Sequence, residues 1–179
     1  MTAPVSDPAA ESAFDLYEAS APVFAHALEN LANLLRKAEE HAKSQELDPA
    51  SLIEARLAPD MFSLARQVQS AADAAKICTA RLAGQKPPSD PDTETTFDQL
   101  QARIAKTLAF IRSVDPALIS SAITRSIEVP LSSGSMSFTG RSYLLKFCLP
   151  NFFFHVTTAY GILRHKGVKI GKLDYLGAL

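Results

Sequence analysis

Apolar residues recur along most of the chain at alternating steps of three and four, the spacing that places side chains on one face of an α-helix. Three of these stripes are long enough to predict amphipathic helices. They consist of Tyr17, Ala21, Phe24, Leu28, Leu31, Leu35, Ala38 and Ala42; of Leu64, Val68, Ala71, Ala75, Cys78 and Leu82; and of Phe97, Leu100, Ile104, Leu108 and Ile111. We therefore expect three long helices that each bury one face.

Local signals predict where the first two helices begin and end. Pro22 should kink the first helix or divide off its first turns, because proline removes a backbone donor, and this helix should end near Gln45. The second helix should begin at Pro59 or Asp60, since proline suits a first turn and a carboxylate there complements the helix dipole. Gly84 should end it.

A proline-rich connection separates the second and third helices. Residues 86–92 include three prolines and should form an irregular crossover rather than a tight hairpin. Thr95, with Asp98 three residues later, resembles a capping box for the third helix, which should stop near Asp115.

The pattern changes between residues 123 and 138. Residues 124–129 alternate loosely between polar and apolar side chains, and Ser132–Ser135 has the composition of a turn. We expect a small β-hairpin or an ordered loop there.

The last helix should run from Gly140 or Arg141 to His165, and it is apolar nearly all round, as expected for a helix that packs on several sides. Pro150 should bend this helix. Four long helices predict one all-α domain over residues 1–179, a four-helix bundle. Residues 1–10 should be a flexible N-terminus, and residues 168–179 a tail packed on the bundle or on a partner subunit.

Chain length and net charge limit the classes of partner that this protein could bind. A chain of 179 residues with 47% apolar residues can bury one core, and 18 basic residues nearly cancel 19 acidic ones. We therefore expect no nucleic-acid or membrane partner. The N-terminus lacks the features of a secretory signal, which predicts a cytoplasmic location. Cys78 and Cys148 lie on apolar stripes, so both should be buried free thiols.

His155 is the most informative polar residue, because it lies on the apolar stripe of the last helix together with Phe152 and Ala159. A buried imidazole needs hydrogen-bond partners, and Asp73 or Gln67 could reach it across the bundle. One interpretation is a core histidine that determines how the helices pack.

The other interpretation is a ligand pocket in the bundle core. Its candidate residues are His155, Asn151, Tyr160, Asp73 and Gln67, which would orient a small polar molecule.

Other charged and polar side chains have simpler interpretations. Asp73 and Lys76 are three residues apart and should form a surface ion pair. Arg103 and Lys106 lie opposite an apolar stripe and should belong to a solvated helix face. His26 should be solvated as well.

Several strings are characteristic of a known family. They are Arg56–Phe62, Gln67–Gln69 with Asp73 and Lys76, Ala80–Gly84, Gln101–Thr107, Leu149–His155 and Gly171–Asp174. On these residues the chain resembles domain-of-unknown-function family 1993, within the DinB-like four-helix bundle superfamily. The resemblance implies an up-down-down-up helix order with long second and third connections, and a homodimer. Several members of the superfamily bind a divalent metal through three histidines, and some are thiol-dependent transferases.

The metal site of that superfamily requires one histidine on the second helix and two spaced by four on the last. Here the second helix has none, and the positions four residues from His155 are Asn151 and Ala159. We therefore expect no metal and no cofactor, and a protein that binds a small ligand or partner without metal-dependent catalysis. One alternative is a thiol-dependent transferase-like enzyme. It would use His155 either as a base or as a ligand of a metal ion held by few protein groups. Another is a structural dimeric interaction module.

Overall fold

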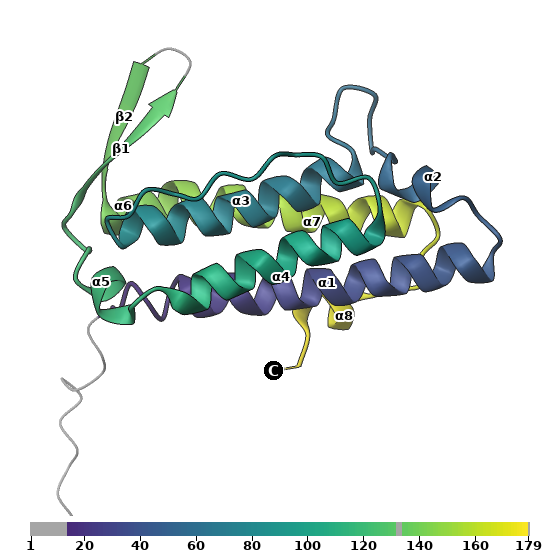
Figure 1. Ribbon diagram of the computed structural model, residues 1–179, viewed down its shortest axis with the longest axis horizontal. Helices are drawn as coiled ribbons and strands as arrows, with labels where there is room; N and C mark the ends of the chain where they lie inside the picture. The colour runs from purple at the N-terminus through teal and green to yellow at the C-terminus, as the bar shows by residue number, and fades with distance from the viewer. Residues whose placement is uncertain (1–13, 132–133, 179) are drawn as a thin grey trace, which may run out of the picture.

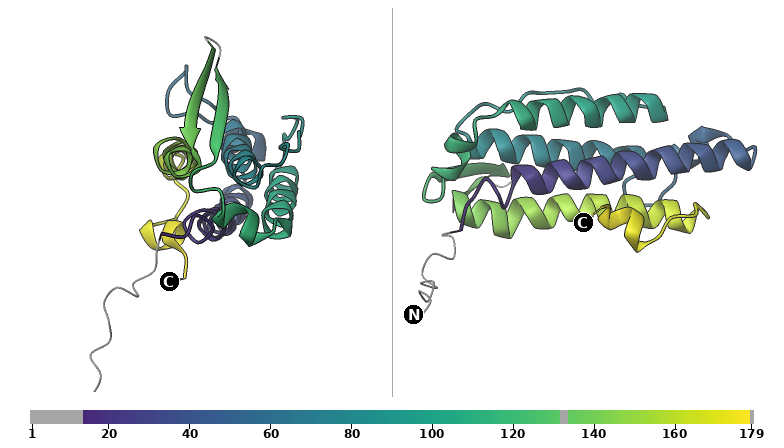
Figure 2. Two further views of the ribbon diagram at one scale, coloured as in Figure 1. Left: turned by 90° about the vertical axis from the view of Figure 1, so that its left-hand side faces the viewer. Right: turned by 90° about the horizontal axis from the view of Figure 1, so that it is seen from below.

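The computed structural model describes residues 14–131 and 134–178, which form an up-down-down-up bundle of four long helices (Figure 1). The first three are α1 (Ala21–Ser44), α3 (Leu64–Leu82) and α4 (Phe97–Ser113), and the fourth ends in α7 (Leu149–His165). An extended crossover returns the chain along the bundle, so α3 and α4 point the same way, and α7 is antiparallel to α3 (Figures 1 and 2). The expected flexible residues 1–10 and part of the expected turn, residues 132–133, lie outside the described residues.

Short elements connect the long helices. They are α2 (Pro49–Ile53), α5 (Pro116–Ser120), β1 (Ser126–Leu131), β2 (Gly134–Thr139), α6 (Gly140–Tyr143) and α8 (Lys172–Leu176). The two strands pair antiparallel, with Ile127 opposite Phe138 and Val129 opposite Met136. The expected hairpin or ordered loop is therefore a hairpin, and it stands beside the N-terminal end of the last long helix (Figure 1).

The three predicted stripes form the core. All six members of the α3 stripe are fully buried, and so are Phe24, Leu28, Leu31 and Leu35 of α1. Cys78 and Cys148 are buried free thiols, as expected, and burial raises the pKa of the Cys78 thiol. Helical periodicity alone was sufficient to identify these buried positions.

Two predicted helix starts were wrong. Helix α3 begins at Leu64 rather than at Pro59 or Asp60, because the Ser63 hydroxyl caps its first turn by accepting from the backbone of Arg66. In α4 the capping box uses Thr96 and Gln99 instead of Thr95 and Asp98. The Gln99 side chain accepts hydrogen bonds from the backbone of both threonines.

The last long helix contains a π turn, Leu144–Cys148, between α6 and α7. This turn lies directly before Pro150, the residue expected to disturb the helix. Proline has no backbone N–H, and its ring crowds the carbonyl four residues earlier, here that of Lys146. A wider turn accommodates both effects, and π turns of this kind are frequent at functional sites.

The C-terminal tail packs on the bundle through α8, which contacts α1 (Figure 2). The ring of Tyr175 lies edge-on to Tyr160 of α7 at 5.7 Å. His26 of α1 is exposed, but its Nε2 lies 2.7 Å from the backbone oxygen of Leu176. His26 is therefore solvent-exposed, as predicted, and its imidazole also contacts the end of the tail, which the sequence did not indicate.

None of the helices in the described part of the chain is both long and apolar enough to cross a membrane.

Candidate functional site

A groove of about 330 Å³ lies between α3 and the last long helix, beside β1. Its volume is at the lower end of the range usual for small-molecule sites. The residues that line it are Ser70, Asp73, Ala74, Ile77, Arg81, Val129, Pro130, Tyr143, Phe147, Cys148, Asn151 and His155.

Two helical stripes form the floor of the groove. On α3, Ser70, Ala74, Ile77 and Arg81 follow one another at steps of four, three and four residues. On the last long helix, Tyr143, Phe147, Asn151 and His155 are spaced by four. Each stripe lies beside a core stripe, and this spacing is the signal from which Arg81, Tyr143 and Phe147 could have been found. The contribution of Val129 and Pro130 has no such signal, because it depends on where the hairpin packs.

His155 pairs with Gln67 at one end of the groove. The imidazole Nδ1 of His155 lies 2.7 Å from the amide oxygen Oε1 of Gln67. The Gln67 amide nitrogen donates to the backbone oxygen of Phe62 at 3.4 Å, which directs its oxygen toward the imidazole. His155 Nδ1 must therefore be the donor. In the neutral ring this leaves Nε2 with a free lone pair.

The surroundings of His155 favour its neutral form. Burial lowers the pKa of this imidazole, and the positive charge of Arg66 lowers it further. Two aromatic rings flank it, Phe62 stacked at 6.4 Å and Phe154 edge-on at 5.4 Å. His155 is therefore a neutral, half-buried group that can accept a hydrogen bond at Nε2.

The structure brings together four of the five predicted candidates. His155, Asn151 and Asp73 line the groove, and Gln67 lies behind His155 as its partner. Tyr160 is not in this group, because its ring packs against the tail instead. Asp73 is not a partner of His155 either, since its carboxylate bonds to Lys76 and Arg103.

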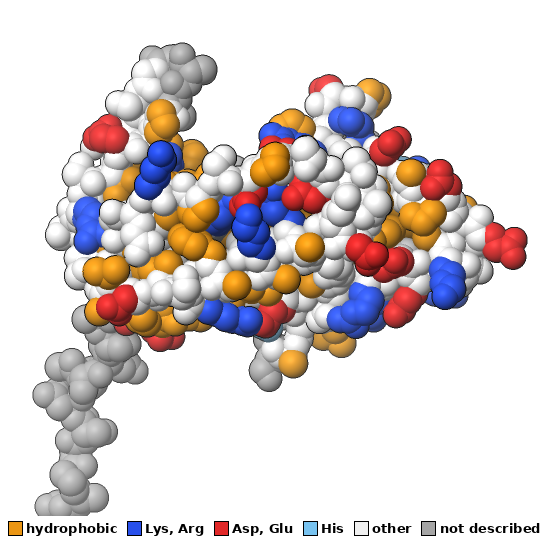
Figure 3. Space-filling view, viewed as in Figure 1, with side chains coloured by type: hydrophobic (Ala, Val, Ile, Leu, Met, Phe, Trp, Pro, Cys, Tyr) orange, Lys and Arg blue, Asp and Glu red, His pale blue; other side chains and the backbone are white. Residues whose placement is uncertain are grey.

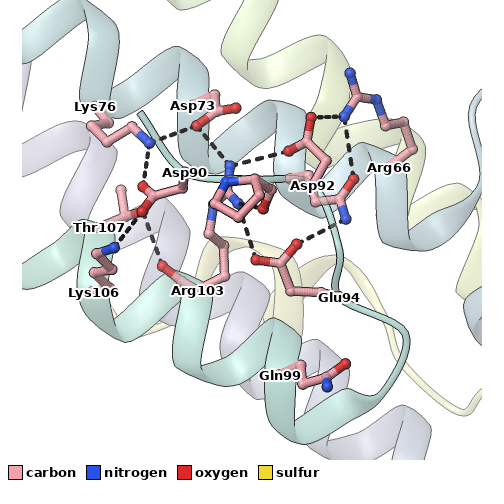
Figure 4. Close-up of polar contacts among 12 residues, drawn as sticks. Arg66, Asp73, Lys76, Asp90, Asp92, Glu94, Gln99, Arg103, Lys106 and Thr107 are labelled. Carbon is pink, nitrogen blue, oxygen red and sulfur yellow. Dashed lines mark hydrogen bonds and ion pairs between the residues drawn. The ribbon is translucent and has the colours of Figure 1, made fainter. Parts of the chain in front are cut away.

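A network of charged side chains adjoins the groove and holds the crossover to the bundle (Figure 4). Arg103 of α4 is only 3% exposed and bonds to Asp73 of α3 and to Asp92 and Glu94 of the crossover, at 2.8, 3.2 and 3.0 Å. Burial opposes the charged guanidinium, but Asp73 and then Glu94 raise the pKa of Arg103 above its ordinary value. The prediction that Arg103 belongs to a solvated face was therefore wrong.

Lys76 is a second buried cation in the network. Its side chain is 3% exposed, and its Nζ lies 2.8 Å from Asp73 and 2.5 Å from Asp90. The expected pair with Asp73 exists, but the crossover covers it, so it is not a surface pair. Figure 3 shows basic and acidic side chains gathered on this face of the molecule.

Because of the charge network, the free energy of unfolding should depend on pH in the acidic range. Two lysines, Lys106 and Lys76, lower the pKa of Asp90 from 3.8 to about 2. A depressed carboxyl pKa stabilises the fold fully above about pH 4, and this contribution is lost as the pH falls toward about 2. We expect Asp90→Asn to remove about 2 kcal/mol at neutral pH. Urea unfolding should show the difference from the natural protein vanishing near pH 2, and a constant difference across that range would contradict the assignment.

Breaking the hydrogen bond between His155 and Gln67 should also lower the free energy of unfolding by a measurable amount. His155→Leu should lower the free energy of unfolding by about 2 kcal/mol, because it leaves the buried Gln67 amide oxygen without a donor. Combining it with Gln67→Leu should recover much of that loss. Urea unfolding of the two single variants and the double variant measures the coupling, and strictly additive losses would show that the two side chains do not stabilise one another.

In residues 14–131 and 134–178, no three histidine, cysteine, aspartate or glutamate side chains are grouped so that they could hold a metal ion. His155 has a glutamine as its partner across the bundle, where a second imidazole would be needed.

The helix order and the long crossover define an up-down-down-up four-helix bundle, the fold expected of a DinB-like protein. The chain belongs to the family described as domain of unknown function DUF1993, whose model matches residues 16–176. It is similar to the crystal structure of a DinB family member protein from Shewanella denitrificans, with 43% identity and a TM-score of 0.87. That similarity covers 92% of this chain and 93% of the other. No curated protein matches the chain significantly.

Proposed function

We propose that this protein binds a small organic ligand in the groove between α3 and the last long helix, without metal-dependent catalysis. The observation that carries the proposal is the composition of the groove. Apolar walls at Ile77 and Phe147 lie between polar groups that still have bonding capacity, His155 Nε2 and the Arg81 guanidinium. Apolar walls with a few convergent polar groups are typical of small-molecule sites.

A thiol-dependent transferase is the alternative from another class. It is favoured by the neutral imidazole of His155, whose free Nε2 could accept a proton from a thiol held in the groove. Consumption of a thiol together with an electrophilic substrate, lost in His155→Gln, would support this alternative. A structural dimeric module is a third hypothesis, and light scattering measures whether the chain forms the homodimer that the resemblance implies.

Blocking the groove tests ligand binding directly. Ala74 lines the groove on α3, and Ala109 is exposed on α4, so Ala74→Phe fills the groove while Ala109→Phe adds the same side chain elsewhere. We expect ligand-observed NMR with a library of acidic, neutral and basic fragments to give binders of the natural protein and of Ala109→Phe. Ala74→Phe should lose them while retaining a cooperative unfolding transition. Equal binding by both variants would contradict a site in the groove.

A further inference from the structure

We propose that the ligand is a small organic acid with one carboxylate and that Arg81 binds this carboxylate at the end of the groove near Tyr143. The inference rests on the proposed ligand-binding function, since it names the chemical class that the same groove selects. It assigns a binding role to a residue outside the set around His155.

The charges of the groove favour an anion. Among the described residues, two formally charged side chains line it, Asp73 and Arg81. Two cations neutralise Asp73, because Lys76 and Arg103 each lie 2.8 Å from its carboxylate. In contrast, no carboxylate of the described residues lies within 4 Å of Arg81. The groove therefore carries one positive charge without a counterion.

Arg81 is held in place and still has donors to offer. Its Nη1 donates to the Tyr143 hydroxyl at 3.1 Å, and its guanidinium lies 5.9 Å from the centre of the same ring. Tyr143 is 1% exposed and stacks on Phe147, so its own position is fixed by packing and its hydroxyl holds the Arg81 guanidinium in place. A guanidinium has five N–H donors, and Tyr143 occupies one of them. The remaining fork can bind the two oxygens of a carboxylate side by side.

The walls beside Arg81 suit the rest of such a ligand. Ile77, Val129 and Phe147 present apolar surface from α3, the hairpin and the π turn. Arg81 and Ser70 are separated along α3 by about 16 Å of helix, and His155 lies toward the Ser70 end through its contact with Gln67. A compact acid can therefore place its carboxylate at Arg81 and its apolar body along the groove without reaching the imidazole.

Three probes that differ in one functional group test the inference. They are 3-phenylpropanoate, the neutral 3-phenylpropanamide and the cationic 3-phenylpropylamine, each titrated by ligand-observed NMR into the natural protein and three variants. Arg81→Gln removes the proposed carboxylate partner. Arg141→Gln removes the same charge from an exposed residue that does not line the groove, and Ala74→Phe blocks the groove.

We expect the carboxylate to bind the natural protein at least about tenfold more tightly than the amide, and the amine more weakly still. Arg81→Gln should abolish that preference but leave amide binding nearly unchanged, whereas Arg141→Gln should retain the preference. Probes that bind, and are lost in Ala74→Phe, but show no preference for the carboxylate or keep it in Arg81→Gln would overturn the inference while sparing the proposed function. Failure of all three probes to bind would overturn the inference, and the fragment screen separately decides the proposed function.

Discussion

Replacement of Gly140 by alanine should lower the free energy of unfolding by about 3 kcal/mol. A Cβ atom at this position would lie 2.1 Å from the backbone oxygen of Ala122. The two segments cannot separate easily, because Gly140 donates to the backbone oxygen of Arg125 and Arg141 donates to that of Ile123. The added methyl group must therefore displace the start of the last long helix from the turn that precedes the hairpin. Chemical denaturation measures the loss.

Gly161 provides a matched control for this prediction. It lies within α7, and an added Cβ would meet only the side chain of Leu57, at an ordinary contact distance of 3.5 Å. Gly161→Ala should therefore stabilise the protein by about 0.5–1 kcal/mol, since alanine loses less backbone entropy in a helix. If both alanine variants were equally stable, close packing at Gly140 would not be the reason for a glycine there.

Replacement of Arg103 by methionine should lower the free energy of unfolding by about 3 kcal/mol. The substitution keeps much of the side-chain volume but leaves Asp73, Asp92 and Glu94 without their shared cation. All three carboxylates are less than a third exposed, so water compensates only partly for the loss. Hydrogen exchange in residues 85–96 should also accelerate, because this guanidinium ties the crossover to α3 and α4.

Arg112→Met is the corresponding control on the same helix. Arg112 pairs with Glu29 of α1, but the two side chains are 59% and 47% exposed. Exposed ion pairs contribute little, so this variant should lose less than about 1 kcal/mol. Equal losses in the two methionine variants would mean that burial does not strengthen the Arg103 network.

Helical periodicity predicted the long helices because the spacing that places apolar side chains on one helix face is a local property of the chain. A residue every three or four positions must be apolar if one face of a helix packs on another. The stripes of α1, α3 and α4 are therefore visible in the sequence and buried in the structure. Helix starts were less predictable, since several neighbouring side chains could cap the same turn. The capping pair of Thr96 and Gln99 prevails over Thr95 and Asp98 because the glutamine reaches two backbone donors.

The site was predictable only in part. The stripe of the last helix identified His155 as a buried polar group, and Gln67 was one of its two predicted partners across the bundle. The other, Asp73, bonds to Arg103 and Lys76 instead, and Tyr160 packs against the tail. The periodicity of α4 placed Arg103 opposite the core stripe, but it could not show that the crossover covers that face.

By itself, the sequence determined the core stripes, because these depend on the spacing of residues along single helices. The helix order and the DinB-like bundle followed from the resemblance of whole segments to a known family. The tertiary structure decided which polar residues meet. Arg81, Tyr143 and the hairpin form one end of the groove, and the crossover buries Lys76 and Arg103 among four carboxylates. The physical reason is that these contacts join segments far apart in the chain, so each depends on how whole elements pack and not on local spacing.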